Sequence, residues 1–242
     1  MRVRVIACEV LFRELCHCAA RAQSIVDLVF LRRGLHDNAD TLREQVQEMI
    51  DETDPERCQA VALGYGLCSN GLAGLRARTL PLVVPRAHDC VTLLLGSKEA
   101  YHRLFSERPG TYYYSGGWVE READSVPRRP QDGAGLDLPF EELVAKYGRE
   151  NAEYLREFQS NWVERYTHST FIDTGLGDRE AYRNYAKQVA ADHGWSFDEI
   201  AGDMRLLQDL VDGRWDDDRF LVVPPGHRIA PTSAADILAA AP

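Results

Sequence analysis

Residues 60–71, AVALGYGLCSNG, decide the fold, because a short apolar run passes there directly into a turn rich in glycine. The run is continuous and does not alternate with polar residues, which is typical of a strand covered on both faces in a parallel sheet. Three further runs have the same character: residues 3–7, 25–31 and 82–84. The chain therefore carries four candidate strands of one buried sheet in its first 84 residues.

Amphipathic segments separate these runs. One of them carries apolar residues at i, i+4, i+7 and i+8, the spacing of a single helical face: Leu42, Val46, Met49 and Ile50. Asp37 or Asn38 is suited to cap the start of this helix. The order of strands and helices predicts an α/β fold, with a mostly parallel sheet, right-handed crossovers and helices on both faces in a Rossmann-like arrangement.

The composition of the chain changes after its first half. We expect an α/β lobe over residues 1–114, a flexible loop or lid rich in glycine, proline and charge over 115–135, and a helix-rich α/β lobe over 136–242. The patterns within these parts predict a helix at 91–106, strands at 111–114, 171–173 and 220–223, and helices at 182–190 and 204–211. The sequence leaves open whether the halves are two lobes or one three-layer domain.

Charge and hydropathy limit the classes of partner. The 242 residues carry a formal net charge of -10, which argues against general affinity for nucleic acid or anionic membranes. No apolar run approaches the about 20 residues of a membrane helix. The first residues enter a strand pattern without a signal-peptide core, so we expect a cytoplasmic protein, with a homodimer as the default assembly.

The chain has six cysteines, none in a Cys-x-x-Cys pair. In a reducing compartment, stable disulfides are not expected. The cysteines are then small buried residues, metal ligands or reactive thiols. Cys16 and Cys18 face different directions on a predicted helix and Cys58 precedes a strand, so we interpret these three as structural.

Ligands of open parallel sheets bind beyond the carboxyl ends of the strands. Residues able to bind a ligand follow six of the seven predicted strands: 8–9, 34–38, 64–71, 86–90, 173–175 and 226–228. Cys8, Cys68 and Cys90 each follow a different strand, so all three can reach one crevice. Three thiolates, with or without His88, suit tetrahedral Zn²⁺, and the same set can hold an iron–sulfur cluster.

Other residues at this edge complete the predicted site. We assign acid, base or carboxylate-gripping roles to His88, His36 and Arg86. Substrate contacts are predicted for the turn and loop residues Gly64, Tyr65, Gly66, Asn70 and Asp89. The glycines meet neither the dinucleotide nor the Walker pattern, so a nucleotide site of those types is not expected.

Two alternatives need no bound metal for catalysis. In the first, Cys8 and Cys68 act as a metal-independent acid and base at carbon, as in glutamate and aspartate racemases, or as in a lyase. The Cys-Thr-His turn of those racemases is missing from this chain. In the second, the protein is a carrier of a ligand, a corrinoid or a metal without turnover of its own.

Several motifs together resemble one widespread prokaryotic family that is known as a domain of unknown function. The resemblance rests on residues 6–11, 34–38, 64–71, 85–90, 109–113, 117–118 and 223–227. Members of that family are often encoded near trimethylamine-methyltransferase-like proteins and small corrinoid proteins. The resemblance therefore implies a link to one-carbon, corrinoid-linked methyl metabolism. Together with the three cysteines, it leads us to expect a zinc-thiolate enzyme or accessory protein of that metabolism, with a small-molecule substrate and a corrinoid protein or methyltransferase as partner.

Overall fold

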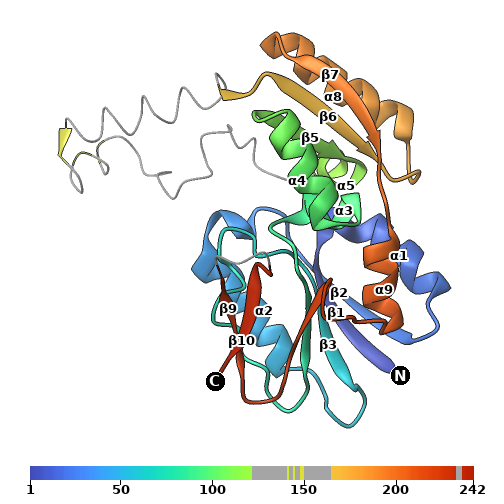
Figure 1. Cartoon of the computed structure of the whole chain (residues 1–242), viewed down its shortest axis with the longest axis vertical. Helices are drawn as coiled ribbons and strands as arrows, with labels where there is room; N and C mark the ends of the chain where they lie inside the picture. The colour runs from blue at the N-terminus through green and yellow to red at the C-terminus, as the bar shows by residue number, and fades with distance from the viewer. Residues whose placement is uncertain (122–140, 142–143, 145–147, 150–164, 233–235) are drawn as a thin grey trace.

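A computed structural model describes residues 1–121, 141, 144, 148–149, 165–232 and 236–242. Within these residues the chain forms an α/β structure with a five-stranded sheet, a three-stranded sheet and a two-stranded hairpin (Figure 1). No helix of the described residues has the length and apolar character to cross a membrane.

The larger sheet has the strand order β2-β1-β3-β4-β8. Its first four strands are parallel, whereas β8 runs antiparallel to β4. The sheet is therefore mixed, and mostly parallel as predicted. The strands are β1 (Arg2–Cys8), β2 (Ile25–Leu31), β3 (Ala60–Gly64), β4 (Leu82–Pro85) and β8 (Phe220–Val223).

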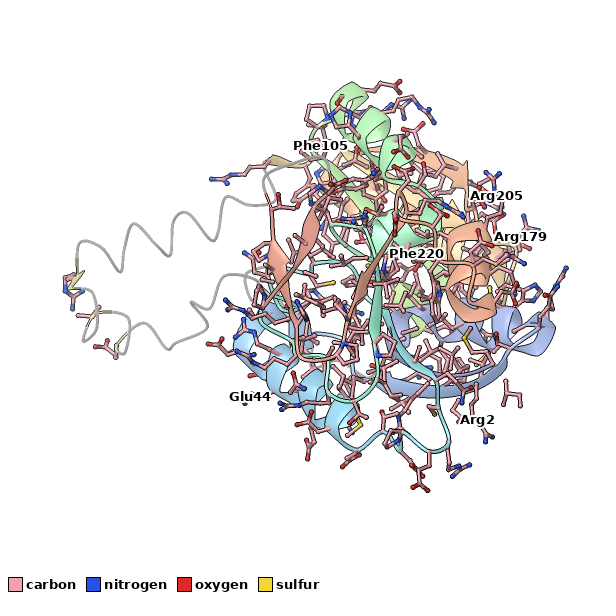
Figure 2. The ribbon with its side chains drawn as sticks, turned by 60° about the horizontal axis from the view of Figure 1, so that its bottom comes forward. Arg2, Glu44, Phe105, Arg179, Arg205 and Phe220 are labelled. Atoms are coloured by element: carbon pink, nitrogen blue, oxygen red, sulfur yellow. The ribbon has the colours of Figure 1, made fainter. Side chains whose placement is uncertain are left out.

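Both faces of this sheet are covered, which explains its continuous apolar strands. On β1, Val3 and Val5 pack in one hydrophobic cluster with Leu207, while Ile6 packs in another with Leu42. Figure 2 shows the fully buried Phe220 inside the molecule. The first cluster includes α1 (Phe12–Arg21) and α9 (Arg205–Asp212); the second includes α2 (Ala39–Asp51) and the hairpin of β9 (Arg228–Pro231) and β10 (Leu238–Ala241).

The smaller sheet is parallel, in the order β5-β6-β7. Tyr114, Phe171, Tyr182 and Ala186 form the buried core between this sheet and α8. Figure 1 shows this sheet beyond one end of the larger one, with α3 and α5 between them. The elements are β5 (Thr111–Ser115), α5 (Gly116–Glu120), β6 (His168–Asp173), α8 (Arg179–His193) and β7 (Ser196–Ala201).

Two short helices replace the single one expected at residues 91–106, so that prediction is wrong. Helix α3 (Cys90–Leu95) ends at Gly96, whose φ of 74° is left-handed, and Ser97 caps α4 (Lys98–Glu107) by accepting a hydrogen bond from the Ala100 N–H. Glycine adopts this conformation readily and serine is a favoured cap, so Gly96 and Ser97 already indicate in the sequence that the helix is interrupted.

The described strands of the second half exceed those predicted, because β7, β9 and β10 were not expected. Of residues 115–135, Ser115 ends β5 and residues 116–120 form α5, while 122–135 lie outside the described residues. Most of residues 136–164, where the predicted helix-rich lobe begins, also lie outside them. The strands predicted at 111–114, 171–173 and 220–223 and the helix at 182–190 are confirmed.

Candidate thiol site at the carboxyl edge of the larger sheet

The order of the strands in the larger sheet reverses direction at β1. The chain passes from β1 to β2 on one side and returns to β3 on the other. In open α/β sheets, such a reversal leaves a crevice at the carboxyl ends of the two central strands, and ligands bind there. Cys8 ends β1, and the turn that holds Cys68 follows β3, so both cysteines lie at this point.

Cys8, Cys68 and Cys90 come together in the fold. Cys8 is buried, Cys68 and Cys90 are half-buried, and all three belong to one apolar cluster. Their thiols are close enough for charge on one to raise the pKa of another: Cys8 acts on Cys68, and both act on Cys90. The structure thus gathers the cysteines that the sequence places after three separate strands.

Close approach of two loops brings Cys68 and Cys90 together. The Leu67 and Cys68 N–H groups donate to the carbonyl oxygens of Ala87 and His88, over 2.8 and 2.9 Å. A Cβ atom on Gly66 would lie 2.5 Å from the backbone nitrogen of Asp89. Only glycine fits at position 66 without moving one loop.

The turn that carries Cys68 has an unusual backbone. Cys68, Ser69 and Asn70 all have left-handed φ angles, of 46°, 54° and 66°. Residues other than glycine adopt this region at a cost, and such conformations concentrate at functional sites. A hydrogen bond from the Gly71 N–H to the Cys68 carbonyl, at 2.9 Å, closes the turn.

All three thiols hold their protons firmly. Burial raises the pKa of Cys8 to about 11 and that of Cys68 to about 12, and it raises the pKa of Cys90 well above its usual value. Hydrogen bonds act in the opposite direction: backbone groups of Val10 and Gly66 stabilise the thiolates of Cys8 and Cys68. Without a positive partner, these thiols are neutral at pH 7.

The hydroxyl of Tyr65 has no hydrogen-bond partner among the described residues, although only 3% of the residue is exposed. It lies close enough to Cys8 and Cys68 for their charges to raise its pKa, though burial is the larger cause. A buried hydroxyl without a partner is costly and rare, so it indicates a place where a bound molecule completes the hydrogen bonding.

The smaller sheet also contributes to this site, through Trp118 on α5. The guanidinium of Arg33 lies 4.2 Å from the centre of the Trp118 ring and donates to the Trp118 carbonyl over 3.1 Å. The Trp118 side chain also hydrogen-bonds Cys90 and favours its thiolate. The Glu9 carboxylate accepts the Arg33 backbone N–H over 2.7 Å, which fixes the loop after β2.

The predicted acid and base residues lie in different surroundings. His36 lies at the rim of the thiol site, its ring 6.1 Å from that of Trp118 and its Nε2 3.4 Å from the Asp37 carboxylate. His88 is exposed and lines a cavity beside α4. Arg86 donates to the backbone carbonyls of Asp217, Asp236 and Leu238, so it supports the chain around β10.

The predicted substrate residues have mixed positions. Asp89 caps α3 by accepting from the Thr92 N–H over 3.1 Å. Gly64 packs against Ala7, where a Cβ would lie 2.6 Å from the alanine Cβ. Asn70 is exposed. Of this group, Tyr65 and Gly66 have the most direct connection to the thiols.

The donor chemistry suits a soft metal, but the sulfurs do not form a ready coordination group. No three His, Cys, Asp or Glu side chains in the described part of the chain are arranged to hold a metal ion. A closed site therefore requires the thiols to move toward one another.

Sequence reasoning missed Trp118 and Arg33. Trp118 lies three residues after the end of β5. The search for residues just beyond the carboxyl ends of strands found the cysteines, and it would have found Trp118 if the residues after 111–114 had been included. Arg33 lies two residues after the end of β2, so the same search could have found it.

Comparison with known proteins gives a family and no function. No curated protein and no solved structure matches the chain. A family model described as "Protein of unknown function (DUF1638)" matches residues 30–211, which include Cys68, Cys90 and Trp118. Since the match covers well over half of the sequence, the chain belongs to this family.

Proposed function

We propose that the protein binds a soft divalent cation, with Zn²⁺ first, through the thiolates of Cys8, Cys68 and Cys90. The convergence of these thiols at the switch point of the larger sheet carries the proposal. Thiolate sulfur is the ligand type that zinc prefers in sites of this kind.

The protonation state of the thiols favours a metal over metal-independent chemistry. A cysteine that acts as base or nucleophile needs an accessible thiolate near pH 7. Here the pKa values of Cys8 and Cys68 lie at about 11 and about 12, and each negative sulfur opposes the next. A cation between them removes that repulsion and displaces the protons, so metal binding is coupled to proton release.

The surroundings support three thiolates once the protons have left. Val10, Gly66 and the Trp118 side chain each hydrogen-bond one of the three sulfurs. Hydrogen bonds of this kind around a metal site orient the ligands and tune their basicity. Cys68 and Cys90 are only half-buried as residues, and we expect their side chains to be able to turn toward a bound ion.

A three-thiolate site leaves one position for a small ligand. Bound zinc supplies Lewis acidity, which keeps an incoming thiol deprotonated at neutral pH and suited to accept a methyl group. The Tyr65 hydroxyl is available to donate a hydrogen bond to that ligand, and the Trp118 ring limits the site toward the smaller sheet. A zinc-dependent enzyme or accessory protein of methyl-group metabolism is the function that this chemistry fits best.

The test is metal titration of the anaerobically purified, untagged protein. We expect one Zn²⁺ per chain, with protons released at pH 7, and Co²⁺ should produce sulfur-to-metal charge-transfer absorption. Cys68→Ser should weaken binding at least tenfold. Cys58→Ser is the matched control, because Cys58 is a buried cysteine outside the cluster.

Two results would overturn the proposal. One is a protein that binds no divalent metal stoichiometrically, or binds it equally in the Cys68 and Cys58 variants. The other is fast alkylation of the metal-free thiols by iodoacetamide at pH 7, unaffected by chelators, which supports the racemase- or lyase-type alternative. Visible absorption of the protein as purified would instead indicate an iron–sulfur cluster or a corrinoid.

A further inference from the structure

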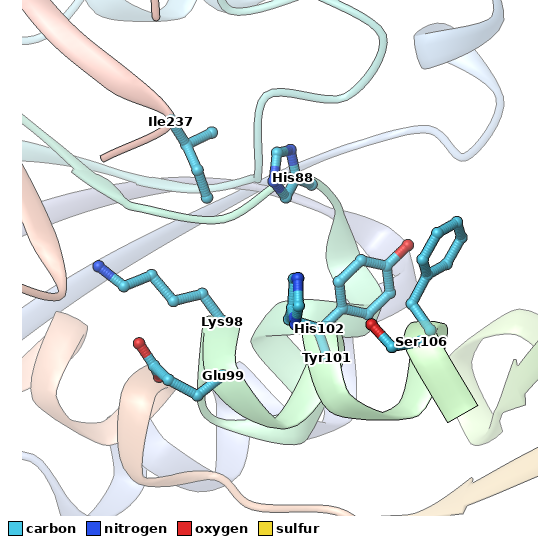
Figure 3. Close-up of a pocket in the computed structure, with 8 residues that line it drawn as sticks. His88, Lys98, Glu99, Tyr101, His102, Ser106 and Ile237 are labelled. Atoms are coloured by element: carbon cyan, nitrogen blue, oxygen red, sulfur yellow. The ribbon is translucent and has the colours of Figure 1, made fainter. Parts of the chain in front are cut away.

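A cavity of about 840 Å³ lies beside α4. This volume is in the range of sites that take cofactor-sized molecules. Figure 3 shows His88 and His102 on opposite sides of this cavity. The lining residues are His88, Lys98, Glu99, Tyr101, His102, Phe105, Ser106 and Ile237.

One wall of the cavity is aromatic. Tyr101 and Phe105, one helical turn apart on α4, have ring centres 6.1 Å apart and planes inclined by 30°. Phe105 is 56% exposed, and Figure 2 shows it at the surface of the molecule. The His88 ring lies 6.5 Å from that of Tyr101. Flat π-faces therefore border the cavity, which suits a planar aromatic occupant.

The polar groups are hydrogen-bonding groups with little net charge. Among the described residues, the imidazole rings of His88 and His102 have no hydrogen-bond partner, so their ring nitrogens can donate to or accept from a ligand. The Lys98 amine lies 3.3 Å from the Asp218 carboxylate, which neutralises it. The Glu99 carboxylate adds a negative charge at the rim.

A second cavity beside α2 provides a contrast. It is lined mostly by charged residues, and two of them, Arg78 and Asp51, form an ion pair at 2.7 Å. It has no aromatic wall among its lining residues. The cavity beside α4 differs from it by offering stacking faces together with hydrogen-bonding groups of little net charge.

From these features we infer that the cavity beside α4 binds a neutral, planar, nitrogen-rich heterocycle of the purine type. The ring stacks on Tyr101 and Phe105, and its edge nitrogens pair with His88 and His102. The Glu99 carboxylate accepts from an exocyclic amine and disfavours anionic ligands. No cysteine of the thiol cluster lines this cavity, although His88 precedes Cys90 by only two residues.

Equilibrium dialysis of the full chain against adenosine, AMP, benzoate and ribose tests the inference. We expect saturable binding of adenosine with a dissociation constant of about 1 mM, from stacking together with the hydrogen bonds of the edge nitrogens. AMP should bind more weakly, and benzoate and ribose should not bind. Phe105→Ala should weaken adenosine binding about tenfold, and His102→Ala should weaken it severalfold. Both side chains are exposed, so these variants are expected to fold.

Phe12→Ala is the matched control, since Phe12 is an exposed phenylalanine on α1 that packs against Phe30 and not against this cavity. Adenosine binding should also survive Cys68→Ser and removal of metal, which separates this result from the fate of the zinc proposal. The inference is overturned if adenosine does not bind saturably, if benzoate or AMP binds more tightly, or if the Phe105 and Phe12 variants bind equally.

Discussion

The carbonyl oxygen of Val10 lies 1.8 Å from the position that a Cβ atom on Gly117 would occupy. Helix α5 of the smaller sheet therefore packs directly on the short helix η1 (Glu9–Leu11) that follows β1. Trp118 is the next residue, and this contact is what places its ring on Arg33 and Cys90. The approach of two backbones thus joins the smaller sheet to the thiol site.

Gly117→Ala should break this contact. The added methyl group forces α5 away from η1, so we expect the free energy of unfolding to fall by about 1–3 kcal/mol, as for other overpacked positions. The Trp118 contribution to the near-ultraviolet circular dichroism should change as well. Gly226→Ala is the control, because a Cβ there would meet nothing within 4 Å. Gly226→Ala should lower stability only because alanine is strained in a left-handed backbone conformation, and it should leave the tryptophan signal unchanged. If the near-ultraviolet spectra of the two variants change equally, the prediction is contradicted.

Trp118→Phe should alter Cys90 without unfolding the protein. The phenyl ring can still pack on Arg33, but the hydrogen bond to the Cys90 sulfur is lost, so the pKa of Cys90 should rise further. Alkylation of Cys90, followed by mass spectrometry, should then require a higher pH, and zinc affinity should fall about tenfold. Trp195→Phe is the control. The Trp195 ring stacks on His193, with ring centres 4.8 Å apart, at the end of α8, and it does not belong to the thiol site. Equal Cys90 reactivity in the two variants would rule out the proposed contact.

The sequence predicted most of the larger sheet, because the apolar run that marks each strand lies within one short segment. The four parallel strands and helix α2 are confirmed, and Asn38 is the cap that the sequence offered beside Asp37. The strand β7 was missed because polar residues interrupt its apolar ones, β9 because it is short and ends in proline, and β10 because it is a short run of one leucine and three alanines. Proline and alanine are both depleted in strands. Their pairing depends on contacts with distant strands, which periodicity alone does not reveal.

Asn38→Ala tests the cap directly. The Asn38 side chain accepts from the Asp40 and Thr41 N–H groups, each over 3.1 Å. Loss of both bonds should lower the free energy of unfolding by about 1 kcal/mol, measured by urea denaturation. Asn38→Ser keeps an acceptor oxygen and should stay within a few tenths of a kcal/mol of the original, as an intact cap requires. Similar losses in both variants would mean that the cap does not matter for stability.

The site was predictable only in part, for a related physical reason. That Cys8, Cys68 and Cys90 meet follows from parallel strands ending at one edge. The unpartnered hydroxyl of Tyr65 and the contact of Trp118 with Cys90 depend on how the loops and the smaller sheet pack, which no local pattern records. His88 was assigned to the right loop, but its side chain lines the neighbouring cavity.

A buried acid lies between the two sheets. Glu14 on α1 is only 1% exposed, and its Oε1 accepts from the Thr174 hydroxyl over 2.7 Å. Its Oε2 has no hydrogen-bond partner in the described part of the chain. Burial raises the pKa of Glu14, and the charge of Glu120 raises it further, while the Thr174 hydroxyl and Arg13 lower it. Burial is the largest cause, so the folded protein holds this proton more tightly than the unfolded chain does.

Glu14→Gln should therefore change how stability depends on pH. Because the pKa of Glu14 is higher in the folded state, its stabilising proton is fully present below the unfolded value of about 4.3 and is lost as pH rises through the folded pKa. Between these values the original protein should lose about 1.4 kcal/mol per pH unit relative to Glu14→Gln, which has no carboxyl to titrate. Urea denaturation at pH 5, 6, 7 and 8 measures this difference.

Glu44→Gln is the control, since Glu44 is exposed on α2 and its replacement should leave the dependence of stability on pH unchanged. Parallel stability curves for the original protein and Glu14→Gln would show that Glu14 is ionised in the folded state throughout this range.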